Sequence, residues 1–168
     1  PTLVVGAGAT GFHVAHQLLG LGCNRICVWD HDNIEESNLN RQLYGMDGIG
    51  QNKAEYLISL LERAAQGSES EQEFIAVPRR LDVFESDPDV IAPFGVVINT
   101  TDNLYHHGSF LHKIAMWANE LPTNWARRIV YISPRMSAFD SEVFVTKPLL
   151  ENEWMYFNTR EEQNELEA

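Results

Sequence analysis

Lysine and arginine are scarce in this sequence: 12 of them stand against 24 aspartates and glutamates, which gives a formal net charge of −12. A surface of that sign repels the phosphate backbone of nucleic acids, so no nucleic-acid partner is expected. The chain also lacks an apolar run that approaches the roughly 20 residues of a membrane-spanning helix. Its N-terminus shows no basic segment followed by an apolar one, as a secretory signal would. These absences lead us to expect a cytoplasmic protein that binds neither nucleic acid nor membrane.

Cysteine is nearly absent, and the two that are present, Cys23 and Cys27, do not have the CxxC spacing of a zinc-binding pair. Cys27 lies within an apolar, strand-like stretch. We interpret both cysteines as small, buried, apolar residues. Nothing in the sequence indicates an oxidising compartment.

Short apolar runs alternate with amphipathic, helix-like stretches along most of the chain. This order is typical of an α/β protein with a mostly parallel sheet. The last two strands have no helix between them, so we expect an antiparallel pair at the sheet edge. We therefore predict one Rossmann-like domain over residues 1–168, with helices on both faces of the sheet and a tail from about residue 149. The predicted strands are residues 2–5, 24–30, 74–78, 95–102, 128–133 and 142–147, and the predicted helices are 9–22, 37–42 (a single turn), 50–65, 86–94 and 103–120.

Gly6, Gly8 and Gly11 form a G-x-G-x-x-G pattern between the first strand and the first helix. The first glycine allows a tight turn, the second lets a phosphate approach the backbone, and the third allows close helix–strand packing. The helix N-terminus adds free N–H groups and a positive dipole end. Asp30 ends the second strand, where a carboxylate can hold a ribose diol; the alternative is a turn or capping residue beside Asp32. The pattern predicts a nucleotide site without choosing between NAD and ATP.

The segment after the second strand favours ATP. It carries Asn38 and Arg41 three residues apart, hence on one face of a helical turn, and Lys53 at the start of the next helix. A dinucleotide does not need these groups, whereas reaction at the α-phosphate of ATP needs fixed cations for the departing pyrophosphate and a carboxylate for the metal. Asp102 follows the fourth strand, at the carboxyl edge where α/β sheets bind ligands.

Each of these residues also has a plain structural interpretation. Lys53 alone is more often a solvated helix lysine. Arg41 alone is more often half of a surface ion pair, here with Glu35 or Glu36. Asp102 could cap the helix that follows it. Their joint occurrence in this order is what favours a triphosphate site.

Four motifs, GAGATG, WDHDNIEESNLNRQ, GIGQNK and NTTDN, together resemble those of the ThiF/MoeB/HesA family, which includes the adenylation domains of ubiquitin-activating enzymes. The resemblance runs from about residue 3 to about residue 147. It implies binding of ATP with Mg²⁺ and adenylation of the C-terminal carboxylate of a small ubiquitin-like or sulfur-carrier protein, or of a peptide, with release of pyrophosphate. It also implies a homodimer or a pseudo-symmetric dimer.

The resemblance also implies roles for single residues. Asp102 would coordinate Mg²⁺, and Asp30 would hold the ribose. The catalytic set would be Arg41, Lys53 and Asp102, and the nucleotide-binding set would be Gly6, Gly8, Gly11, Asp30, Asn38, Arg41, Gln42 and Lys53.

The chain departs from the family pattern at several points. It has Ala9 and Phe12 where many members carry a glycine and a small polar residue, and it has neither the CxxC zinc pairs nor a cysteine placed for a thioester step. It shows no N-terminal helix whose arginine would reach the active site of a partner subunit. Arg127, Arg128 and Arg135 are candidates for that arginine, with little in the sequence to favour them. A non-catalytic scaffold that binds nucleotide or a partner is therefore the alternative function, and an NAD-dependent oxidoreductase is the third.

Overall fold

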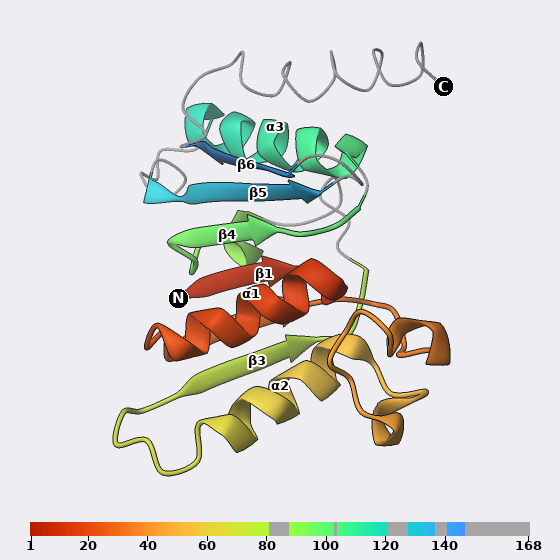
Figure 1. Ribbon diagram of the computed structural model, residues 1–168. Coiled ribbons are helices and arrows are strands. Elements are labelled where there is room, and N and C mark those ends of the chain that lie inside the picture. The colour runs from red at the N-terminus through yellow and green to blue at the C-terminus, as the bar shows by residue number, and fades with distance from the viewer. Residues whose placement is uncertain (81–87, 103, 121–127, 137–140, 147–168) are drawn as a thin grey trace. The chain divides into compact units, whose positions relative to one another are not determined.

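The computed structural model describes residues 1–80, 88–102, 104–120, 128–136 and 141–146. They belong to two compact units, Pro1–Leu81 and Asp82–Ala168, and each is described by itself. The first unit contains β1 (Thr2–Val5), α1 (Ala9–Gly20), β2 (Arg25–Trp29), α2 (Lys53–Ala64) and β3 (Glu73–Val77), with short 3₁₀ turns η1 (Glu36–Asn38) and η2 (Met46–Gly48) between β2 and α2 (Figure 1).

The three strands of the first unit are parallel and lie in the order β3-β2-β1. In this register Val4 pairs with Val28, and Val28 pairs with Ala76. β1 is buried along its whole length, and β2 is buried from its second residue onward. Such unbroken burial is why both strands are continuous apolar runs rather than alternating ones.

α1 and α2 pack side by side on one face of these strands, as Figure 1 shows. Asn52 immediately precedes α2. Its side chain accepts hydrogen bonds from the amides of Ala54 and Glu55 and thus caps the helix. Its apolar side faces the sheet and its polar side faces solvent. The helices and strands enclose one buried cluster: Val4, Ala7, Phe12, Ala15, Ile26, Val28, Ile34, Tyr44, Ala54, Tyr56, Leu57, Ile58 and Leu61.

The second unit contains η3 (Pro88–Val90), β4 (Val96–Asn99), α3 (Leu104–Glu120), β5 (Val130–Met136) and β6 (Ser141–Thr146). β4 and β5 form a parallel pair, and β5 and β6 form an antiparallel pair. Ile98 pairs with Ile132 in the first pair, and Ser133 pairs with Phe144 in the second. The ring of Phe110, from α3, lies 6.0 Å from the ring of Tyr131 in β5, so this helix covers that face of the strand.

The predicted α/β class, with mostly parallel strands and an antiparallel edge, is confirmed. The helix predicted over 86–94 is wrong in length: within 88–94 the chain forms only a 3₁₀ turn and a further turn, because Pro93 has no N–H to donate to a preceding carbonyl. β4 ends at Asn99 rather than at 102, because the Asn99 side chain accepts from Thr101 and turns the chain away. The predicted tail lies outside the described residues, and none of the described helices has the length and apolarity to cross a membrane.

The buried cluster yields a stability prediction. Leu61 has no exposed surface in it, so Leu61→Ala should lower the free energy of unfolding by about 2–5 kcal/mol through lost burial and an internal cavity. Leu21 is 83% exposed, and Leu21→Ala should change the same quantity by less than about 0.5 kcal/mol. Urea denaturation followed by circular dichroism measures both. Equal losses in the two variants would contradict this assignment of the core.

Candidate functional site

The turn between β1 and α1 has the backbone that the glycine pattern predicts. Gly6 has a φ of +92°, a conformation that L side chains rarely adopt, and its amide donates to the Trp29 carbonyl over 2.8 Å. Gly8 caps α1 without a side-chain hydrogen bond, and a Cβ added there would meet nothing within 4 Å. Gly11 is buried in the first turn of the helix. Open space thus lies next to helix-end amides that no side chain caps, which is the arrangement that binds phosphate.

Asp30 connects the end of β2 to this turn. Its Oδ2 accepts the Ala7 amide over 2.6 Å, and its Oδ1 accepts the Asp32 amide over 2.7 Å. Asp30 therefore does stabilise a turn, as its structural interpretation predicts. A carboxylate has about four acceptor positions, however. These two hydrogen bonds use only part of its accepting capacity. The residue is half-buried at the carboxyl edge of the strands.

Lys53 is not a solvated helix lysine. It is only 8% exposed, and its Nζ lies 3.2 Å from Oδ2 of Asp32. Asn52 fixes this position, because its Nδ2 donates to the carbonyls of Asp30 (3.0 Å) and Asp32 (3.1 Å) while its Oδ1 caps α2. A buried ammonium needs a nearby anion, and Asp32 supplies one from the exposed side. We did not predict the roles of Asn52 and Asp32, although an asparagine just before an amphipathic helix is a recognisable cap signal.

Asn38 ends η1, and its side chain closes a capping box with Glu35: Oδ1 accepts the Glu35 amide over 3.1 Å. Its carbonyl accepts the amides of Arg41 (3.3 Å) and Gln42 (3.0 Å), which confirms the predicted helical turn here. Arg41 is exposed, and its guanidinium has no partner among the described residues, so the ion pair with Glu35 or Glu36 does not form there.

Gln42 is 6% exposed, and its Oε1 is buried without a hydrogen-bond partner in the part of the chain that the structure describes. A buried polar atom without a partner costs free energy unless a ligand or water satisfies it. Gln42 is therefore the residue of this segment whose buried amide still lacks a polar partner among the described residues.

Asp102 belongs to the second unit and is exposed beyond the end of β4. Its predicted helix-capping role depends on residue 103, outside the described residues. Of the three arginines considered as substitutes, Arg128 is exposed, Arg135 belongs to β5, and Arg127 lies outside the described residues. In the first unit, Asp30, His31 and Asp32 bring ligand atoms within 4.8 Å of one another, but Asp30 and Asp32 already serve the glycine turn and Lys53.

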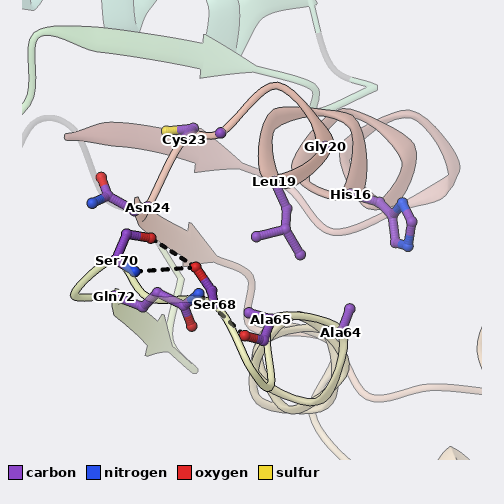
Figure 2. A pocket seen from close by; sticks show the side chains of 11 residues that line it. His16, Leu19, Gly20, Cys23, Asn24, Ala64, Ala65, Ser68, Ser70 and Gln72 are labelled. Atoms are coloured by element: carbon purple, nitrogen blue, oxygen red, sulfur yellow. Dashed lines mark hydrogen bonds between the residues drawn. The ribbon is translucent and has the colours of Figure 1, made fainter.

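A cavity of about 400 Å³ lies at the amino edge of β2 and β3, away from the glycine turn (Figure 2). Ala64, the last residue of α2, and Ala65, which follows it, line the cavity on one side, and Leu19 of α1 lines it on another. Two pairs of its polar groups are hydrogen-bonded: Ser68 with Ser70 over 2.8 Å, and Gln72 with the Ala65 carbonyl over 3.3 Å. Nothing in this cavity calls for a ligand, so the candidate site stays at the carboxyl edge.

The family model described as "ThiF family" matches residues 2–164. Adenylyltransferase and sulfurtransferase MOCS3 of Anopheles gambiae is 35% identical over 103 residues, 61% of this chain and 22% of the relative. The sulfur carrier protein adenylyltransferase of Thermus thermophilus is 32% identical over 102 residues, 60% of this chain and 36% of the relative. The chain thus matches between 22% and 36% of the length of these relatives.

Two solved structures share the fold. E. coli MccB, in a structure with AMPCPP and MccA, aligns with a TM-score of 0.67 and 21% identity over 88% of this chain and 41% of MccB. E. coli tRNA N6-threonylcarbamoyladenosine dehydratase, TcdA, in complex with AMP, aligns with a TM-score of 0.62 and 21% identity over 77% of this chain and 49% of TcdA. Identities this low establish the fold alone.

The two cysteines are unsuited to covalent catalysis. Cys27 is buried in β2, and burial raises the pKa of its thiol to about 11. A raised pKa removes the thiolate that a thioester-forming enzyme needs. Cys23 is half-buried beside the cavity of Figure 2, away from the glycine turn. The expectation that both are buried holds for Cys27 and only in part for Cys23.

Thiol labelling tests this difference. Iodoacetamide at pH 8 should alkylate Cys23 in the folded chain and leave Cys27 unmodified. Cys27 is buried, and its thiol stays protonated at pH 8 because its pKa is about 11. Both thiols should react after denaturation, and Cys23→Ser should abolish labelling of the folded chain. Mass spectrometry identifies the modified residue. Fast native labelling of Cys27 would show that its surroundings are not those described here.

Proposed function

We propose that this chain, which belongs to the ThiF family, transfers AMP from ATP to the C-terminal carboxylate of a small ubiquitin-like or sulfur-carrier protein, or of a peptide. The names of two relatives, adenylyltransferase MOCS3 and sulfur carrier protein adenylyltransferase, support this activity. The structures of MccB with AMPCPP and MccA, and of TcdA with AMP, support an adenine nucleotide as ligand. The partner is a small protein or peptide, and the working enzyme is a dimer.

The observation that carries the proposal is the buried Lys53 at the edge that also holds the glycine turn. Asn52 joins the two, since it caps the helix of Lys53 and donates to the carbonyl of Asp30, whose carboxylate holds the turn. A scaffold would not need a buried ammonium there, because burying one costs several kcal/mol before pairing offsets it. A dinucleotide site does not need it either, since the turn alone serves a pyrophosphate.

The first unit fits a nucleoside triphosphate on three counts. Space is open above Gly8, Gln42 has an unpartnered buried amide atom, and Arg41 is free of ion pairs among the described residues. Asp30 would hold the ribose, the glycine turn the phosphate nearest to it, and Asn38, Arg41, Gln42 and Lys53 the remaining phosphates. Asp102, in the second unit, would hold Mg²⁺, which supplies positive charge for the reaction.

In the proposed reaction a carboxylate oxygen of the substrate attacks the α-phosphorus of ATP. The bond from that phosphorus to the oxygen bridging to the β-phosphate breaks, and pyrophosphate leaves with the electron pair. The products are an acyl adenylate and pyrophosphate, so the step needs no other reactant. The contribution of this chain is to hold the two reactants in line and to stabilise charge on the departing group through Arg41 and Lys53.

ATP–pyrophosphate exchange tests the proposal. The chain, mixed with a β-grasp carrier that ends in Gly-Gly, should exchange labelled pyrophosphate into ATP only when Mg²⁺ is present. Arg41→Ala should lower the exchange rate about 100-fold or more, because one fixed charge on the developing anion is lost. Lys53→Met, which keeps the buried volume, and Asp102→Asn should have effects of the same order.

Arg63→Ala is the matched control, because Arg63 is an exposed arginine in the last turn of α2. It should leave exchange unchanged. ATP binding without exchange, across several carriers, would favour the scaffold over the enzyme. Tight NADH binding with no ATP binding would favour an oxidoreductase.

A further inference from the structure

Tyr44 holds the glycine turn from a side that the glycine pattern does not predict. Its hydroxyl donates to the Ala7 carbonyl over 2.5 Å, and the contact is buried. The Ala7 amide donates to Asp30, so both polar groups of Ala7 have side-chain partners. Without the Tyr44 hydroxyl, the carbonyl would be buried with no partner, which destabilises this conformation of the turn.

The ring of Tyr44 is fixed as firmly as its hydroxyl. It is 5% exposed and packs edge-on against Phe12 of α1 (centroids 4.9 Å apart) and Tyr56 of α2 (5.8 Å). Burial raises the pKa of Tyr44, and the negative charge of Asp30 raises it further, so the hydroxyl stays protonated and donates throughout the working pH range. Edge-on aromatic pairs of this kind add to the stability that burial provides.

Arg41 lies between two anchored positions. On one side Leu39 packs against the buried cluster, and on the other Tyr44 is bonded to the glycine turn. Exposure alternates from Arg41 to Tyr44: Arg41 and Leu43 face solvent, whereas Gln42 and Tyr44 are buried. Tyr44, three residues along the chain from Arg41, thus connects this segment to the glycine turn by a direct hydrogen bond.

We infer that Tyr44 is a positioning residue for the triphosphate: it fixes the segment of Arg41 and Gln42 against the glycine turn without touching the nucleotide. This inference rests on the proposed function. The first phosphate is held by the turn, and the outer phosphates are held by the segment. A change in the distance between the turn and the segment therefore lowers the affinity for ATP more than the affinity for AMP. It also lowers the rate of adenylation more than it lowers the affinity for ATP.

Tyr44→Phe tests this, because it keeps the ring and removes one donor. We expect ATP affinity to fall about tenfold and AMP affinity by less than about threefold, measured by calorimetry. The kcat of pyrophosphate exchange should fall further than the affinity. Tyr56→Phe is the matched control: Tyr56 is a buried tyrosine of the same cluster, but its hydroxyl donates to Asp47 over 2.8 Å and does not contact the turn. It should leave the ratio of ATP to AMP affinity unchanged.

Amide hydrogen exchange gives a readout that needs no nucleotide. In the wild-type chain, peptides covering 6–12 and 38–44 should open with one common rate, and Tyr44→Phe should speed exchange in both. Separate wild-type rates, or equal losses of ATP and AMP affinity in Tyr44→Phe, would overturn the inference and leave the proposed function standing. A wild-type chain that binds no ATP would overturn the proposed function itself, whatever the exchange rates.

Discussion

The carboxylate of Asp30 is the constraint on which the site depends. It holds the Ala7 amide on one side and the Asp32 amide on the other, while the carbonyl of the same residue accepts from Asn52. Three segments that are distant in sequence thus meet at the carboxyl edge of β1 and β2: the glycine turn, the end of β2 and the first turn of α2. Asn52 in turn sets the start of α2, and this brings Lys53 into the protein interior. The position of the proposed phosphate-binding cation follows from how a strand end satisfies its backbone.

This arrangement also explains how a chain of net charge −12 could accept a polyanion. The charges of the acids nearest the turn are offset locally, that of Asp30 by two backbone amides and that of Asp32 by Lys53. A carboxylate that accepts backbone N–H groups repels a neighbouring anion less than a free one. Arg41 stays exposed and unpaired among the described residues, so its charge is available at the surface. Favourable potential at such a site is local and does not depend on the sign of the whole surface.

The sequence predicted those parts of the site that local rules decide. The glycine turn, the strand before it and the amphipathic helix after Asn52 follow from spacing and backbone preference, and the parallel order follows from alternation of strands and helices. The burial of Lys53 and the bond from Tyr44 to Ala7 could not be predicted this way. Each joins residues more than 20 positions apart (Asp32 with Lys53, Ala7 with Tyr44), and tertiary packing decides such contacts. β4 ends earlier than predicted for a local reason, the hydrogen bond between the Asn99 side chain and Thr101, but strand propensity alone does not predict that bond.

The connection between β2 and α2 is where this chain differs most from a simple dinucleotide-binding unit. Residues 30–52 join the two elements, whereas a strand and the helix that follows it are usually connected by about 2–6 residues. Ordering so long a connection costs conformational entropy, which its contacts must offset. Ile34, Tyr44 and Gly48 are buried, and the last of these is so close to Tyr56 that an added Cβ would lie 3.0 Å from its ring. Among the described residues, this tightly packed connection leaves Arg41 exposed and a buried Gln42 amide atom without a partner, which supports its proposed role as a binding loop rather than a linker.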